Sequence, residues 1–134
     1  MKFFVYLFTL LLFSEMCLAN NFSWKKSATT NDDSSTWYYD KNTIAKVGSY
    51  NFAWVMADYH KPEGEDISAI SYMMIHCDSY EMKWISYTGY SKSMGKGRVT
   101  DEFIIPEEDL SYFKWEYFDP KNTTLGVVLK KICN

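Results

Sequence analysis

The chain has 134 residues, a formal net charge of −3 and 47% hydrophobic residues, which fits one domain rather than two. The weak negative charge argues against a nucleic-acid partner, because such a partner needs a concentrated basic surface. The sequence has neither a long run of like charges nor a low-complexity tail, so its composition is that of a folded domain.

The first residues are typical of a cleavable secretion signal. Lys2 gives the positive start, and a mostly apolar run follows over residues 3–13. The small residues Cys17 and Ala19 lie three places and one place before the cleavage point that this pattern predicts. We therefore expect a cleavable signal peptide over residues 1–19.

A membrane anchor and a lipid-attached chain are the alternatives for this segment. A helix of about eleven residues spans about 16 Å, against about 30 Å for the hydrocarbon core of a bilayer. Lipid attachment at Cys17 would need a small residue before it and usually a leucine three places before it, whereas Met16 and Ser14 occupy these positions. We expect residues 20–134 to form one exported domain without a stable transmembrane segment, in the periplasm, at the cell surface or outside the cell.

Two cysteines remain after cleavage, Cys77 and Cys133. In an oxidising compartment they allow one intramolecular pair, and closing a loop of about 57 residues would stabilise the fold by about 4 kcal/mol in the chain-entropy model. A metal pair and a catalytic thiol are the alternatives. A metal site needs about four ligands, and His76 would point away from Cys77 on a strand. We expect a structural disulfide, with no metal and no other cofactor.

The middle of the chain alternates strand and turn signals. Extended segments are predicted over residues 36–39, 43–47, 49–59, 67–77, 82–90 and 98–105. The short connection over residues 78–81 predicts an antiparallel hairpin between its two neighbours. Polar residues with Pro and Gly predict loops over 60–66 and 91–97.

The C-terminal part carries the helical signals. Pro106 followed by acidic residues favours a short helical turn over 107–114, and residues 115–118 look extended. Apolar residues at helical spacing predict a helix over 125–132, which the polar residues at 122–124 could cap. Gly126 should weaken this helix by about 1 kcal/mol relative to Ala. The predicted fold class is α+β.

A resemblance to a known family follows from residues spread over the whole domain. In chain order they are Trp24, Tyr38, Tyr39, Asp40, Thr43, Ile44, Gly48, Trp54, Asp58, Tyr59, Cys77, residues 95–97, Trp115, Asp119, Pro120, Ile132 and Cys133. In this order and spacing the chain resembles the surface-adhesin protein E family of bacterial envelope proteins. The resemblance implies a single twisted antiparallel sheet of about five to six strands. It also implies a C-terminal helix packed on one face and a disulfide between Cys77 and Cys133.

The resemblance also implies a function. The family takes its name from a lipid-anchored outer-membrane adhesin that binds host extracellular-matrix and plasma proteins. We therefore expect an exported, non-catalytic envelope protein whose partner is a host matrix protein or another envelope protein. The alternatives are a periplasmic structural or assembly factor with the same fold, and an uncharacterised hydrolase.

Familiar catalytic motifs are missing from the sequence. A Gly-x-Ser-x-Gly element and a phosphate-binding loop are both absent, and His60 and His76 are the two histidines. We expect His60 to be a solvated loop residue, His76 to be structural, and the acidic run over 107–109 to be a solvated turn. No catalytic residue is predicted.

Aromatic residues are more numerous than one buried face requires. The segment 67–77 is apolar on both of its predicted faces. One face can pack under the C-terminal helix, and the other must meet loops of the chain, a second copy in a homodimer, or a ligand. The candidate interface or binding residues are Tyr72, Trp84, Tyr87, Tyr90 and Lys96.

Overall fold

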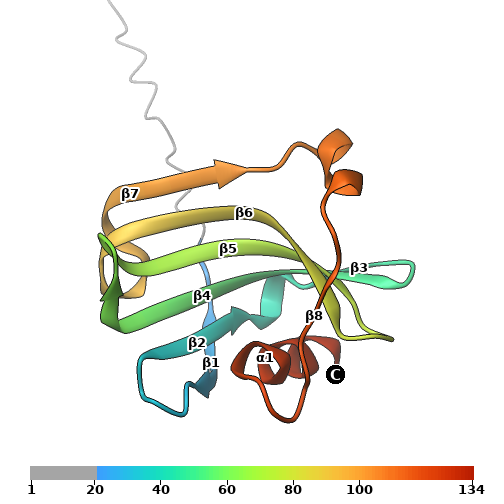
Figure 1. The fold of residues 1–134 in the computed structure, drawn as a ribbon, viewed down its shortest axis with the longest axis horizontal. Helices are drawn as coiled ribbons and strands as arrows, with labels where there is room; N and C mark the ends of the chain where they lie inside the picture. Colours follow the sequence, from blue (N-terminus) through green and yellow to red (C-terminus); the bar gives the residue numbers. More distant parts are fainter. Residues whose placement is uncertain (1–20) are drawn as a thin grey trace, which may run out of the picture.

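The computed structural model describes residues 21–134 (Figure 1). The signal peptide expected over residues 1–19 lies outside the described residues. Within residues 21–134, none of the helices has the length and apolar character needed to cross a membrane.

One antiparallel sheet of eight strands forms the body of the domain. Its main path runs β1-β2-β4-β5-β6-β7, while β3 pairs with β4 and β8 pairs with β6. The strands are β1 (Trp24–Thr29), β2 (Ser35–Asp40), β3 (Ala45–Val47), β4 (Tyr50–Glu63), β5 (Asp66–His76), β6 (Glu81–Lys92), β7 (Lys96–Ile104) and β8 (Glu116–Tyr117). The predicted α+β class and single antiparallel sheet are confirmed, but the expected five to six strands are too few.

Strand β1 is not predicted from the sequence. Its sequence, WKKSAT, is polar, and a register shift between Lys26 and Ala28 breaks the alternation of its side chains. A polar edge strand with an irregular register gives no clear period-two signal. Its partner β2 was predicted from its aromatic residues, so the sequence showed one strand of the pair and not the other.

Two predicted loops are shorter than expected. Strand β4 continues to Glu63, so the connection to β5 is the turn at Gly64 and Glu65 rather than the loop expected over 60–66. Strand β6 continues to Lys92, and the 3-10 turn Ser93–Gly95 leads directly into β7. In both places long-range strand pairing overrides the local Pro and Gly signals. The predicted hairpin of β5 and β6 is confirmed.

The helix α1 (Thr124–Cys133) is the last element of the chain. Besides the Ser93–Gly95 turn, 3-10 turns precede it at Lys41–Thr43 and Glu107–Tyr112. Thr123 caps the helix, because its side-chain oxygen accepts a hydrogen bond of 3.0 Å from the backbone N–H of Gly126. Gly126 also has a packing role, since a Cβ at this position would overlap the backbone carbonyl of Asp119. Gly126 weakens the helix locally, but it allows the loop at Asp119 to pack closely against α1.

The core lies between α1 and one face of the sheet. Figure 1 shows α1 against β1 and β2 at one end of the sheet, where it also contacts β4. The largest fully buried core side chains come from β4, β5, β6 and α1: Val55, Met73, Ile75, Met82, Val128 and Leu129. Burying an aliphatic side chain of this size stabilises the fold by about 1.5–3 kcal/mol.

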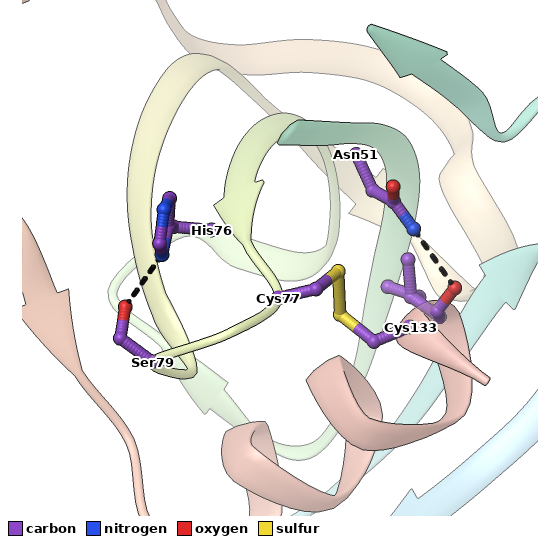
Figure 2. The surroundings of a disulfide bond; sticks show 6 residues. Asn51, His76, Cys77, Ser79 and Cys133 are labelled. Carbon is purple, nitrogen blue, oxygen red and sulfur yellow. Dashed lines mark hydrogen bonds between the residues drawn. A yellow bond between two sulfur atoms is a disulfide. The ribbon is translucent and has the colours of Figure 1, made fainter. Parts of the chain in front are cut away.

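A disulfide joins the end of α1 to the end of β5 (Figure 2). Cys77 and Cys133 are bonded with their Cα atoms 5.6 Å apart, which confirms the predicted pairing. Beside this bond, the side-chain amide of Asn51 donates a hydrogen bond of 3.4 Å to the backbone carbonyl of Ile132. The last turn of α1 is thus fixed to both β4 and β5.

A candidate binding cavity beside the C-terminal helix

The helix α1 covers only one end of the face on which it packs. Trp37 and Trp84 pack against the core beneath the helix, and beyond them lies a cavity of about 350 Å³. The residues that line it are Trp37, Val55, Ala57, Tyr59, Ala69, Ser71, Trp84, Tyr87 and Phe103. The cavity is therefore mainly aromatic, and it belongs to the helix-bearing face of the sheet.

The cross-strand register explains why this face is hollow. Trp37 lies opposite Ala57, Ala57 lies opposite Ala69, and Ala69 lies opposite Gly89. Directly paired residues point to the same face, so β4, β5 and β6 place a row of very small side chains side by side. Large aromatic side chains surround this row: Trp37 comes from β2, Phe103 from β7, and Tyr59, Trp84 and Tyr87 from other positions of β4 and β6.

A β-bulge in β6 brings two of the predicted binding residues together. Tyr72 pairs with Ser86 and Met73 pairs with Trp84, so Ile85 is an extra residue without a partner in β5. A regular strand would place Trp84 and Tyr87 on opposite faces, because they are three residues apart. The bulge turns both side chains to the helix-bearing face, where both line the cavity.

A buried carboxylate lies behind the wall of the cavity. Asp66 is 8% exposed, and its two oxygens accept hydrogen bonds from the hydroxyls of Tyr87 and Thr100. Thr100 is a second bulge residue, because Gly89 pairs with Asp101 whereas the next residue, Tyr90, pairs with Val99. Gly89 supplies the space for the carboxylate, since a Cβ there would lie 2.5 Å from Asp66 Oδ1.

The tyrosine hydroxyls of the cavity remain protonated far into the alkaline range. Burial raises the pKa of Tyr87 well above its usual range, and the hydrogen bond to Asp66 raises this pKa further. Burial also raises the pKa of Tyr59. Both phenols are therefore neutral at physiological pH, and Tyr87 keeps donating its proton to Asp66.

Asp66 has no cationic neighbour in this environment. Within residues 21–134, no lysine or arginine lies at ion-pair distance from an acidic side chain; the one contact at this distance joins His60 Nδ1 to Asp33 Oδ1 at 3.3 Å. The charge of Asp66 is therefore stabilised by hydroxyl groups and not by a lysine or arginine of the described chain.

The opposite face of the sheet carries a row of half-buried aromatic side chains. The ring of Tyr72 lies 4.7 Å from that of Trp54 and 6.1 Å from that of Phe52, measured between centroids. At one end of this face Trp115 stacks on Tyr50 at 5.7 Å. At the other end the turn containing Gly95 packs on the side chain of Ile70. Loops thus cover both ends of this face and leave its middle half-buried.

The five predicted binding residues do not form one site. Trp84 and Tyr87 meet in the cavity beside α1, whereas Tyr72 lies on the opposite face. Tyr90 also lies on that face, because it pairs with Ser68, whose hydroxyl bonds to the backbone of the Ser93–Gly95 turn. Lys96 is exposed at the start of β7. The binding surface that the sequence suggested is therefore two separate aromatic surfaces.

Sequence reasoning missed the residues that give the cavity its shape and charge. Phe103 and Asp66 were assigned no role, and the small residues Ala57, Ala69 and Gly89 drew no attention. Small residues on neighbouring strands signal a hollow only once the strand register is known. In the sequence Asp66 is one of several acidic residues in a polar segment, so nothing marks it as a buried group.

His60 lies on β4 and not in the expected loop, but its side chain is 37% exposed and is therefore solvated as expected. Its Nε2 is 3.0 Å from Thr36 Oγ1, and its Nδ1 is 2.8 Å from the backbone carbonyl oxygen of Asp33 and 3.3 Å from the carboxylate Oδ1 of the same residue. This order of groups resembles a hydrolase triad. However, Thr36 is 6% exposed and the side chain of Asp33 is 81% exposed. The hydroxyl is thus buried away from a substrate, and the contacts tie the β1–β2 turn to β4.

His76 has a structural environment next to the disulfide. Its Nδ1 is 2.9 Å from Ser79 Oγ (Figure 2), and its ring contacts Tyr50 at 5.4 Å between centroids. Within the described residues, no group of three or more His, Cys, Asp or Glu side chains is placed to hold a metal ion.

The sequence matches a known protein family. The family model of surface-adhesin protein E matches residues 24–134. No curated protein matches the chain. Solved structures of Haemophilus influenzae protein E are similar. Crystal form II is 18% identical, with a TM-score of 0.48, and the match covers 72% of this chain and 79% of that one. A second structure is 14% identical, with a TM-score of 0.49 and coverages of 81% and 83%. By the match of the family model over almost all of the described residues, the chain belongs to the surface-adhesin protein E family.

Proposed function

We propose that this chain is an exported protein of the bacterial envelope that binds a protein partner and catalyses no reaction. The family match over residues 24–134 carries the proposal. The family is one of surface adhesins, whose function is to bind other molecules at the cell surface. The aromatic cavity beside α1 supports the same conclusion, because Tyr, Trp and Phe are enriched in protein interfaces.

The edge of the sheet extends this cavity into a larger apolar surface. Phe103 lines the cavity beside α1 and also a second cavity of about 560 Å³ near the end of β7. The neighbouring side chains of Ile104 and Phe113 are 68% and 48% exposed. β7 is an edge strand of the main sheet path, and such an edge can pair with a strand of a partner. We name this surface, formed by the two cavities and their shared Phe103, the β7 surface.

The partner that we propose is a host extracellular-matrix protein, with another envelope protein as the second candidate. The test is saturable binding of the purified protein to a panel of immobilised matrix proteins. Phe103→Ala should lower the affinity about five- to thirtyfold, as expected for an aromatic side chain at the centre of an interface. Val99→Ala is the matched control, because Val99 is 50% exposed on the same strand but lines neither cavity of the β7 surface.

A periplasmic structural or assembly factor with this fold is the alternative. Protease treatment of intact cells distinguishes the two, because a surface protein is digested from outside. Protection until the outer membrane is opened would overturn adhesion to host proteins. In that case, binding that still depends on Phe103 would identify an envelope protein as the partner.

The homodimer suggested by the apolar sheet stays a prediction. The aromatic row around Tyr72 is the surface that such a dimer would bury. Sedimentation of wild type and of Tyr72→Arg tests it, because a charge inserted in a dimer interface should shift the protein to the monomer. A monomeric wild type would contradict the homodimer and leave the β7 surface unaffected.

A further inference from the structure

The cavity beside α1 has a distinct electrostatic character. Five of its nine lining residues are aromatic, and neither lysine nor arginine lines it. Three further cavities, near Leu110, Phe113 and Ile132, each include at least one lysine. The face of an aromatic ring attracts a cation through its quadrupole, most strongly for Trp. This cavity therefore offers a cation several favourable faces and no repelling charge.

Asp66 adds a negative charge directly behind this wall. A buried carboxylate without a cation is costly to maintain, yet three features of the fold hold it in place. Gly89 leaves space for it, and hydroxyls of Tyr87 and of the bulge residue Thr100 bond to it. The hydrogen bond from Tyr87 shifts electron density toward its phenol oxygen and ring. The ring that Tyr87 presents to the cavity is thereby made a better partner for a cation.

We infer that the cavity beside α1 receives the cationic side chain of a lysine or arginine residue of the partner protein. The inference rests on the proposed function and deepens it, because it names the group that this part of the β7 surface recognises. The volume of about 350 Å³ lies near the lower end of the range for ligand sites, about 300–1,000 Å³. A single long side chain fits this size better than a large cofactor does.

The shape of the cavity matches the two parts of such a side chain. Its aliphatic stem would lie on Ala57 and Ala69, the small apolar residues in the middle of the sheet. Its charged end would lie among the aromatic rings, on the side where Tyr87 connects to Asp66. The attraction would be felt through the hydroxyl of Tyr87, so the side chain needs no direct contact with the carboxylate.

The test uses two probes that differ in one charge. N-acetyl-lysine methylamide and the neutral N-acetyl-norleucine methylamide are titrated separately into the purified protein at millimolar concentrations. Binding is followed by the NMR signals of the indole N–H groups of Trp37 and Trp84. We expect the lysine probe to bind at least about fivefold more tightly than the neutral probe, because a partly desolvated cation–π contact has this magnitude.

Two variants locate the interaction. Tyr87→Phe keeps the ring and removes the hydroxyl, and it should lower the preference for the lysine probe about threefold or more. Tyr90→Phe is the matched control on the same strand, because Tyr90 lies on the opposite face. Asp66→Asn removes the charge while keeping an oxygen acceptor, and it should lower the preference at least as much. Unfolding measurements on each variant separate lost binding from lost structure.

Equal binding of the two probes, or a preference that survives both Tyr87→Phe and Asp66→Asn in folded protein, would overturn the inference. The proposed function would stand in that case if binding to the matrix panel still depended on Phe103. If the lysine probe binds as expected and the panel shows no binding, the cavity is a cation site and the proposed partner class is wrong.

Discussion

The carboxylate of Asp66 occupies the space that a side chain on Gly89 would fill, since a Cβ on Gly89 would lie 2.5 Å from Asp66 Oδ1. The two residues are 23 positions apart in the sequence and meet because β5 and β6 are paired. The chain can therefore keep a buried acidic group at this point only with glycine opposite it. The cavity beside α1 depends on this pair, because the same carboxylate accepts the hydroxyl proton of Tyr87.

Gly89→Ala should destabilise the protein by about 1–3 kcal/mol, because the new methyl group must displace a buried, hydrogen-bonded carboxylate. The measurement is urea unfolding followed by circular dichroism. In an Asp66→Ala background the same substitution should cost much less, since the overlapping group is gone. An equal cost in both backgrounds would contradict the coupling of Asp66 and Gly89.

Gly126→Ala should also destabilise the protein, although alanine is the better helix former by about 1 kcal/mol. The reason is that the Cβ would overlap the backbone carbonyl of Asp119, which a rotamer change cannot relieve. Lys130→Ala, at an exposed position of the same helix, is the control and should change the free energy of unfolding by less than about 0.5 kcal/mol. A more stable Gly126→Ala variant would show that the loop before α1 yields easily.

The disulfide should account for a large part of the stability. Replacing both Cys77 and Cys133 by serine should lower the free energy of unfolding by about 4 kcal/mol in the chain-entropy model. A thiol reagent added to an unfolded, unreduced protein of residues 20–134 should label no cysteine. Labelling of two thiols per chain would contradict the bond that joins β5 to α1.

The lowered pKa of Asp32 leads to a prediction about the stability of the β1–β2 turn in acid. A side-chain hydrogen bond with Ser34 and another with Thr30 lower the pKa of Asp32 from 3.8 to about 2. Because the folded-state pKa lies below the unfolded value, this carboxylate stabilises the turn above about pH 4, and its contribution is lost as the pH falls toward 2. NMR titration of the Asp32 carboxyl should give a midpoint near 2, and Ser34→Ala should move it upward. A midpoint near 3.8 in the wild type would contradict these contacts.

The local features of the fold could be predicted from the sequence, and the cavity could not. The helix α1 follows from apolar spacing and from a capping residue at Thr123, both of which are local signals. The β5–β6 hairpin follows from one short turn. The cavity instead depends on the register that aligns Ala57, Ala69 and Gly89 across three strands. Such alignment arises from pairing between distant segments, which local periodicity does not record.

The two bulges also could not be predicted from the sequence, and they change which residues share a face of the sheet. Period-two alternation separates Trp84 from Tyr87, and the extra residue Ile85 reunites them. Thr100 can bond to Asp66 for a similar reason, because it is an extra residue of β7 without a partner in β6. The aromatic residues were thus identified as candidates from composition, while their division between two faces required the structure.

The central claim is that this protein binds a protein partner through the β7 surface. Site-specific photo-crosslinking in the cells that produce the protein tests it most directly, with the crosslinking residue placed at Phe103 in one variant and at Val47 in another. Val47 is 61% exposed on β3 and lines neither cavity of the β7 surface. We expect a saturable covalent adduct with one protein from position 103 and none from position 47. No adduct from position 103, or the same adducts from both positions, would contradict the claim.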